Sequence, residues 1–196
     1  MREAAPDDAA WVAVETPLGP AELAVFCRDV ERLYRINPYL EFRAWHAEPD
    51  GATATFRNLS NGRDCALRLT IEDASASGFT VRYDRGIKRA TRFAIDPLPE
   101  GRSRLTITDD YTGAGTDADL GEVDRSLRAW GVALKAYLQR EARWGRYPLW
   151  RWYMRRVWVP MKPAARRITF IILVIALAEV ALFALVMAIY WAEHLR

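Results

Sequence analysis

Two patterns of apolar residues divide the chain. Between residues 40 and 108, apolar and polar residues alternate in short runs, whereas residues 168–192 form an apolar run with one charge, Glu179. Alternation is typical of strands with one buried face, and an apolar run of this length is typical of a helix that crosses a membrane. The sequence therefore predicts a β-rich domain followed by a membrane span.

The alternating part predicts a meander of six strands, and one further strand precedes it. We expect these strands near residues 10–16, 40–47, 52–59, 65–72, 79–84, 91–95 and 104–108. Turn sequences such as Asn61-Gly62 and Ser77-Gly78 separate them, and short connections of this kind favour antiparallel pairing. One face of this sheet should be packed and the other solvated.

Two segments carry apolar residues at helical spacing instead. The first is Ala21–Leu33, which Pro20 opens. The second is a long helix over Leu120–Ala142, for which Asp117 or Asp119 is the expected N-cap. The apolar stripe of this long helix consists of Leu120, Val123, Leu127, Trp130, Leu134, Tyr137 and Leu138. Such a helix should lie across the packed face of the sheet.

This order of elements resembles the START-like superfamily, the helix-grip fold of polyketide cyclases and lipid-transfer domains, over roughly residues 8–142. The resemblance rests on element order and on the early strand-Pro-Gly-Pro-helix stretch, since the superfamily has no strict signature motif. It implies an α+β fold in which a curved antiparallel sheet of about seven strands grips the last helix. Another α+β grip or a lipocalin-like barrel would share much of this pattern.

The resemblance also implies a hydrophobic cavity between sheet and helix. Its expected walls are Phe56, Leu67, Leu69, Phe79, Val81, Tyr83, Phe93, Leu105 and Ile107 on strands, and Leu127, Trp130, Leu134 and Tyr137 on the helix. The same residues could instead fill a dry core. A ligand-sized apolar pocket is one of two outcomes that the sequence leaves open.

The apolar run is long enough to span a bilayer. Its 25 residues make a helix of about 37 Å at ~1.5 Å per residue, against roughly 30 Å of hydrocarbon. Fourteen of them are Leu, Ile, Val or Phe, so insertion outweighs the cost of about 3 kcal/mol for one central acid. Glu179 should face protein and marks a contact with a partner helix, unless it is simply tolerated in its neutral form.

The approach to the span interleaves aromatic residues with arginine. Pro148 should open a short amphipathic helix, and Pro160 and Pro163 should end it before the span. Its aromatic and arginine residues suit the headgroup level of an anionic membrane; they are Trp144, Trp150, Arg151, Tyr153, Arg155, Arg156 and Trp158. We expect this helix to lie flat on the lipid, although an extension of the long helix or a docking surface for another membrane protein would fit the same pattern.

Charge is divided unevenly along the chain. Residues 1–139 hold 18 basic and 22 acidic residues, net −4, whereas residues 140–196 hold 10 and 3, net +7. An acidic domain argues against nucleic acid as a partner. Basic residues gather before the span, and the N-terminus lacks the pattern of a signal peptide. We therefore expect the domain in the cytoplasm and the C-terminus on the opposite side, as for a bacterial inner-membrane protein.

Candidate chemistry is sparse. The two histidines, His46 and His194, lie in a predicted strand and beyond the span, so they cannot share a site. Cys27 and Cys65 have no metal-ligand spacing and are expected as reduced, buried thiols. Asp109 and Asp110 are expected as surface acids at a strand end. The sequence therefore predicts no catalytic residues, metal or cofactor, and a cyclase or aromatase activity is the weaker alternative.

Three regions follow, with two hypotheses for their function. Residues 1–142 form the START-like domain, 143–165 the basic and aromatic segment, and 166–196 the span with its tail. The first hypothesis is a non-catalytic, membrane-anchored protein that binds a lipid or another hydrophobic small molecule. The second is an accessory or assembly subunit of a membrane complex, docked through its span and the segment before it.

Overall fold

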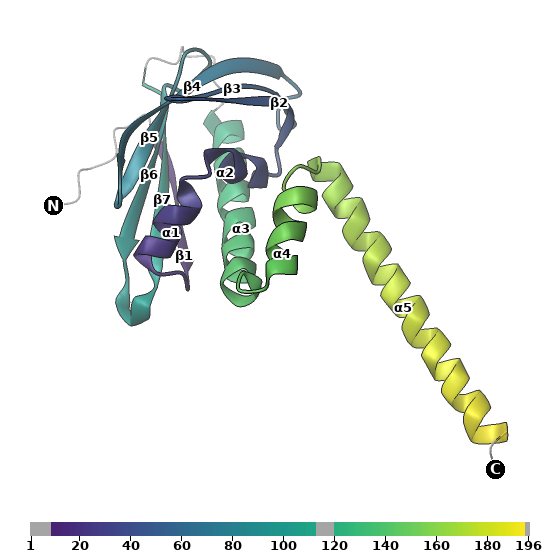
Figure 1. Cartoon of the computed structure of the whole chain (residues 1–196). Helices are drawn as coiled ribbons and strands as arrows, with labels where there is room; N and C mark the ends of the chain where they lie inside the picture. The colour runs from purple at the N-terminus through teal and green to yellow at the C-terminus, as the bar shows by residue number, and fades with distance from the viewer. Residues whose placement is uncertain (1–8, 113–119, 195–196) are drawn as a thin grey trace. The chain divides into compact units, whose positions relative to one another are not determined.

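The computed structural model describes residues 9–112 and 120–194, and the side chains of residues 120–125 lie outside this description. The chain divides into two compact units, Met1–Pro160 and Met161–Arg196. The first unit is a curved sheet with helices packed on one side of it (Figure 1). The second is a single long helix.

Seven antiparallel strands form one sheet in the order β1-β7-β6-β5-β4-β3-β2. Their bounds are Ala9–Thr16 for β1, Leu40–Glu48 for β2, Gly51–Asn58 for β3, Asp64–Ser75 for β4, Gly78–Tyr83 for β5, Ala90–Pro97 for β6 and Ser103–Asp110 for β7. A short 3-10 turn, η1, covers Pro99–Gly101 between β6 and β7. The predicted strands and their antiparallel pairing are confirmed.

The sheet is organised by one long-range pairing. β1 lies against β7, with Val14 opposite Leu105, so the first and the last strand of the sequence are neighbours in the sheet. All other neighbours are consecutive strands joined by short connections. Because Val14, Leu105 and Ile107 are each less than 3% exposed, this pairing fixes the packed face of the sheet at its β1 edge.

Two short helices replace the single helix predicted over 21–33. α1 covers Pro20–Cys27 and α2 covers Val30–Ile36. The chain breaks at Asp29, whose carboxylate accepts a hydrogen bond from the Arg32 backbone N–H at 3.1 Å and so caps α2. The apolar spacing runs through this break without interruption, which is why periodicity alone did not predict it.

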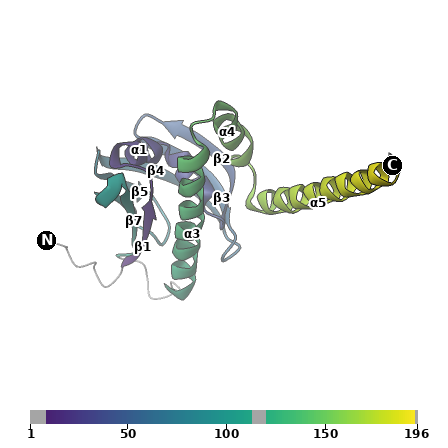
Figure 2. The same cartoon turned by 90° about the horizontal axis from the view of Figure 1, so that it is seen from below.

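α3, Leu120–Trp144, is the helix that the sheet grips. It lies alongside the sheet in the view from below (Figure 2). At Gly131 a Cβ atom would come within 2.6 Å of Val12 on β1, so glycine permits this close approach. The predicted stripe is buried at Leu127, Trp130 and Leu134, as well as at Tyr137 and Leu138. Leu120, Val123 and the proposed caps Asp117 and Asp119 lie outside the described side chains.

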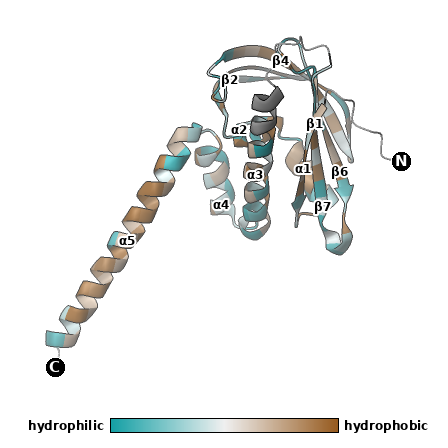
Figure 3. Cartoon of the chain, turned by 180° about the vertical axis from the view of Figure 1, so that it is seen from behind, coloured by the Kyte–Doolittle hydropathy of each residue, from teal (hydrophilic) through white to brown (hydrophobic). Residues whose placement is uncertain are grey.

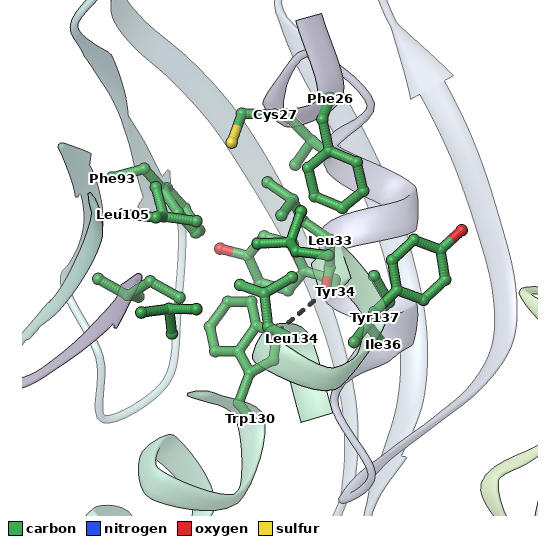
Figure 4. Packing of buried hydrophobic residues seen from close by; sticks show 14 of the residues in the cluster. Phe26, Cys27, Leu33, Tyr34, Ile36, Phe93, Leu105, Trp130, Leu134 and Tyr137 are labelled. Carbon is green, nitrogen blue, oxygen red and sulfur yellow. Dashed lines mark hydrogen bonds between the residues drawn. The ribbon is translucent and has the colours of Figure 1, made fainter. Parts of the chain in front are cut away.

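The core joins the sheet, the helix pair and α3. Figure 4 shows Trp130 and Leu134 of α3 packed among Leu33 and Tyr34 of α2 and Phe93 and Leu105 of the sheet. The Trp130 indole N–H donates to the Leu33 carbonyl at 3.0 Å, so the buried ring has a polar partner (Figure 4).

Residues 148–158 of the basic and aromatic segment are helical and belong to the first unit. α4 covers Pro148–Tyr153 and continues into η2, a π-helical turn over Met154–Trp158. Met154 is 2% exposed and belongs to the hydrophobic core, against which Trp150, Tyr153 and Trp158 also pack. This segment is therefore a structural part of the domain.

The second unit is α5, Pro163–His194. It is apolar over most of its length, with hydrophilic residues towards both ends, as the colouring by hydropathy shows (Figure 3), and in length and composition it is a candidate membrane span. It begins five residues earlier than the predicted span because Pro163 is suited to the first turn of a helix.

Candidate functional site

A cavity of about 380 Å³ opens into the first unit between α2, α3 and strands β2–β5. Its walls are largely apolar and aromatic. The residues that line it are Tyr34, Asn37, Leu40, Phe42, Trp45, Ala54, Phe56, Asn58, Ser60, Asn61, Arg63, Cys65, Leu67, Leu69, Tyr83, Arg85, Gly86, Ile87, Lys88, Ser126 and Trp130. A volume of this size suits a small apolar ligand, since such pockets span roughly 300–1,000 Å³.

The cavity occupies only one part of the region that the sequence indicated. Among the predicted wall residues, it is lined by Phe56, Leu67, Leu69, Tyr83 and Trp130. The others pack against one another as core; they are Phe79, Val81, Phe93, Leu105, Ile107, Leu127, Leu134 and Tyr137. Phe79 and Phe93, for example, stack with ring centroids 4.6 Å apart. A ligand-sized pocket and a dry core, the two outcomes that the sequence left open, therefore both occur in this domain.

Several wall residues were missed by sequence reasoning. Tyr34 and Asn37 come from the end of α2, and Phe42 and Trp45 come from β2. The Phe42 and Trp45 rings lie 5.6 Å apart, and a register shift between Phe42 and Ala44 interrupts the alternation of β2. This irregularity hid the inward direction of Trp45 from a strict two-residue period.

The carboxylate of Asp109 is buried next to the cavity but does not line it. Asp109 is completely buried, which corrects the expectation of a surface acid. It accepts hydrogen bonds from Thr91 at 2.6 Å and from Tyr111 at 3.2 Å, and it pairs with Lys88 at 2.5 Å. Its neighbour Asp110 points the other way, as successive strand residues do, and bonds to Thr112.

A series of hydrogen-bonded hydroxyl groups connects this carboxylate to the cavity. Tyr83 lies 2.7 Å from the Thr91 hydroxyl and 2.5 Å from the Tyr34 hydroxyl. Burial is the main cause that raises the pKa of both Tyr34 and Tyr83 above the ordinary value of 10. Both phenols therefore remain neutral hydrogen-bonding groups over the physiological range of pH.

The structure places the predicted membrane-interface residues at the end of α3, which holds Trp144, and on two sides of α4 and η2. Trp150, Tyr153 and Trp158 are half-buried against the domain, and the Trp158 ring lies 5.4 Å from Tyr137. This corrects the expectation that they form a lipid-facing side. Arg151, Arg155 and Arg156 are exposed, as is Trp144. Contact of these exposed residues with lipid stays a prediction.

Leu149 and Trp152 join the exposed side, with exposed fractions of 76% and 58%. Together with Trp144 they leave large apolar side chains beside the exposed arginines of the segment. This mixture of aromatic, aliphatic and basic groups has the composition of a membrane-surface helix.

Three buried polar atoms without a hydrogen-bond partner occur where α2, α3 and α4 meet. They are Arg32 Nε, Tyr137 Oη and Trp150 Nε1. The Arg32 guanidinium lies 4.1 Å from the Phe26 ring centroid and 3.6 Å from Glu141, which offset part of the cost of burying its charge.

The remaining candidate residues are scattered. Cys27 is buried, Cys65 lines the cavity at intermediate exposure, and His46 is exposed on β2. Glu179 lies within α5. Over the described ranges, no group of three or more His, Cys, Asp or Glu side chains is arranged to hold a metal ion.

The arrangement of sheet and gripping helix recurs in solved structures. An aromatase/cyclase from Streptomyces aligns with a TM-score of 0.53 at 13% identity, over 70% of this chain and 97% of that chain. A START superfamily protein from Mycobacterium smegmatis aligns with a TM-score of 0.51 at 15% identity, over 66% and 96%. The fold is START-like. This confirms the α+β helix-grip prediction.

A protein from Deinococcus radiodurans shares the START-like fold as well, with a TM-score of 0.51 at 16% identity over 70% of this chain and 98% of that chain. By sequence, no protein-family model and no curated protein matches the chain. At these identities the START-like likeness concerns the fold alone, and the site must be argued from its own residues.

Proposed function

We propose that the protein is a membrane-anchored START-like module that binds a lipid, an isoprenoid, a pigment or another hydrophobic molecule without transforming it. The observation that carries the proposal is the cavity of about 380 Å³ with aromatic and aliphatic walls. An apolar molecule that enters it leaves water and contacts rings such as Phe42, Trp45 and Trp130.

The lining chemistry favours binding over catalysis. One of the similar folds belongs to an aromatase/cyclase, but no His, Asp or Glu lines this cavity within the described residues. Asp109 is enclosed behind the wall and paired with Lys88. A general acid or base needs direct reach to its substrate, so non-catalytic binding is the simpler proposal.

The membrane supplies both anchor and ligand. α5 has the length and apolarity of a span, and arginines precede it at Arg166 and Arg167 while only Arg196 follows it. This distribution favours a cytoplasmic domain. Exposed Trp152, Arg155 and Arg156 on α4 and η2 suit contact with anionic headgroups at the same surface.

The test is to identify what the full-length chain carries out of its native membrane. We would extract it gently, release it from detergent in a mass spectrometer, and compare it with the variant Ala54→Leu. Ala54 lines the cavity and is 3% exposed, so a larger side chain there takes up ligand space. Ala66→Leu is the matched control, because Ala66 lies on the adjacent strand and is exposed.

We expect a bound hydrophobic molecule in the parent chain and in Ala66→Leu, and a loss of at least about fivefold in Ala54→Leu, since overpacking costs about 1–3 kcal/mol. Occupancy that is equal in all three chains would contradict binding in this cavity. A parent chain that emerges empty, even after incubation with lipid extract, would overturn the proposal.

Glu179 supports a second candidate, an accessory or assembly subunit of a membrane complex. It is an ionisable side chain in the middle of an otherwise apolar helix, and such residues normally face protein. In mild detergent the parent chain should elute with a partner, and Glu179→Leu should elute alone. Glu193→Gln, near the helix end, is the control; a parent chain that elutes as a monomer would rule out this candidate.

A further inference from the structure

A continuous set of hydrogen bonds runs from one cavity-lining residue to another through the interior of the sheet. Tyr34 lines the cavity and lies 2.5 Å from Tyr83, which also lines it. Tyr83 continues to Thr91 at 2.7 Å, and Thr91 continues to Asp109 at 2.6 Å. Lys88, again on the cavity wall, closes the set by its ion pair with Asp109 at 2.5 Å.

The hydrogen bonds of this series can have only one donor-to-acceptor direction. The carboxylate of Asp109 accepts, so the single proton of the Thr91 hydroxyl is committed to it. Thr91 must then accept from Tyr83, and Tyr83 must accept from Tyr34. The ion pair with Lys88 fixes this direction, because it keeps the carboxylate in the accepting form.

Tyr34 is left with acceptor capacity and no proton to give. Besides Tyr83, its hydroxyl also interacts with Thr91, whose single proton is already committed to Asp109. At the other end, the Lys88 ammonium carries three protons, of which Asp109 takes one. The wall thus offers an acceptor at Tyr34 and donors at Lys88.

We propose that Tyr34, Tyr83 and Lys88 form a polar anchoring site that selects hydrophobic ligands bearing an alcohol or phenol group. This inference rests on the proposed function, since it specifies the ligand of the same cavity. A hydroxyl is the smallest group that both donates to Tyr34 and accepts from Lys88. The aromatic rings around it hold the apolar body of the ligand.

Other polar groups match the site less well. An ether or a ketone accepts from Lys88 but gives no proton to Tyr34, so the phenol oxygen loses water without a replacement. Sites built to hydrogen-bond a hydroxyl reject analogues that lack it, because the unpaired partner group bears the cost.

The experiment compares two ligands that differ by one donor. Full-length chain in amphipol would be titrated by calorimetry with 1-naphthol and with 1-methoxynaphthalene, and empty amphipol would correct for partitioning. We expect 1-naphthol to bind about fivefold to tenfold more tightly, the range of one net hydrogen bond. In Tyr34→Phe the preference should vanish, because the ether no longer leaves a phenol oxygen unpaired and its affinity rises towards that of 1-naphthol.

A second variant changes the direction of the hydrogen bonds without changing any residue that lines the cavity. Thr91→Val removes the acceptor that orients Tyr83, so Tyr34 is no longer held as an acceptor, and the preference should fall although every lining residue is retained. Tyr39→Phe, outside the cavity wall, is the matched control and should keep the preference. Circular dichroism confirms that each variant is folded.

The two proposals fail in different ways. Equal affinities for the two ligands in the parent chain, or a preference that persists in Tyr34→Phe, would overturn the anchoring site and leave apolar binding in place. Absence of binding of both ligands to folded parent chain would overturn the cavity as a site for aromatic ligands, and the anchoring site with it.

Discussion

Asp109 shows how a single residue can organise a region of the domain. It is completely buried, yet three hydrogen-bonding side chains from β6, the β5–β6 turn and the end of β7 converge on it. A buried charge is tolerated only when it is paired and hydrogen-bonded. The carboxylate therefore holds the turn that carries Lys88 against the cavity.

Replacing Asp109 with Asn should be strongly destabilising. The variant keeps the size of the side chain but leaves Lys88 without its counter-charge, so we expect a loss of roughly 2–4 kcal/mol in the free energy of unfolding. Asp110→Asn is the adjacent control on the solvent side and should cost under about 1 kcal/mol. Guanidinium unfolding of the full-length chain, followed by circular dichroism, measures both; equal losses would contradict the role given to Asp109.

Cys27 gives the domain a defined sensitivity to alkaline pH. Burial raises the pKa of its thiol from 9 to about 12. The unfolded chain therefore loses this proton before the folded chain does, and the contribution to stability is complete below pH 9 and lost as pH rises towards 12. Unfolding curves at pH 8 and 10.5 should show a decrease that is about 1–2 kcal/mol smaller in Cys27→Ala. An identical decrease in the two chains would refute this assignment.

At the scale of elements, the alternation of the strands carried most of the information. Every second residue of β7 points inward, namely Ser103, Leu105, Ile107 and Asp109. The two-residue period that predicts this strand therefore also predicts that Asp109 is buried. The expectation failed because a carboxylate was assigned to solvent by its chemistry alone. The break at Asp29 was missed for the opposite reason, since helical spacing continues across it.

The face of α4 could not be predicted because its sequence suits two surroundings. Trp150, Met154 and Trp158 suit a bilayer as well as a protein core, and only the position of α3 decides between them. Similarly, the cavity and the dry core use the same residue types. Which part remains hollow depends on side-chain packing in three dimensions, and periodicity carries no information on that.

Docking of α4 and η2 should contribute measurably to the stability of the domain. Met154 is 2% exposed, so Met154→Ala should cost roughly 2–5 kcal/mol through the cavity it leaves. Leu149→Ala on the same segment removes an exposed side chain and should change stability by less than about 0.5 kcal/mol. Thermal unfolding of both variants in one detergent makes the comparison, and similar melting temperatures would show that the segment is not docked in solution.

For the whole molecule, the proposed span predicts a definite topology. If α5 spans the inner membrane of a bacterium as proposed, the basic residues before it should hold the first unit in the cytoplasm. Protease added to spheroplasts should leave that unit intact, whereas protease added to inverted vesicles should digest it. Digestion in spheroplasts would reverse the proposed orientation.

The short connection after η2 has a further consequence. Only Met161 and Lys162 lie between Pro160 and the start of α5 at Pro163, a reach of about 11 Å even when fully extended. If α5 spans a bilayer as proposed, the first unit stays beside that bilayer and would meet its ligand by lateral diffusion, so its occupancy would follow the mole fraction of that ligand in the leaflet and not its aqueous solubility. Under that proposal, the domain would present its ligand to neighbours in the same membrane, and it could not diffuse freely from one membrane to another.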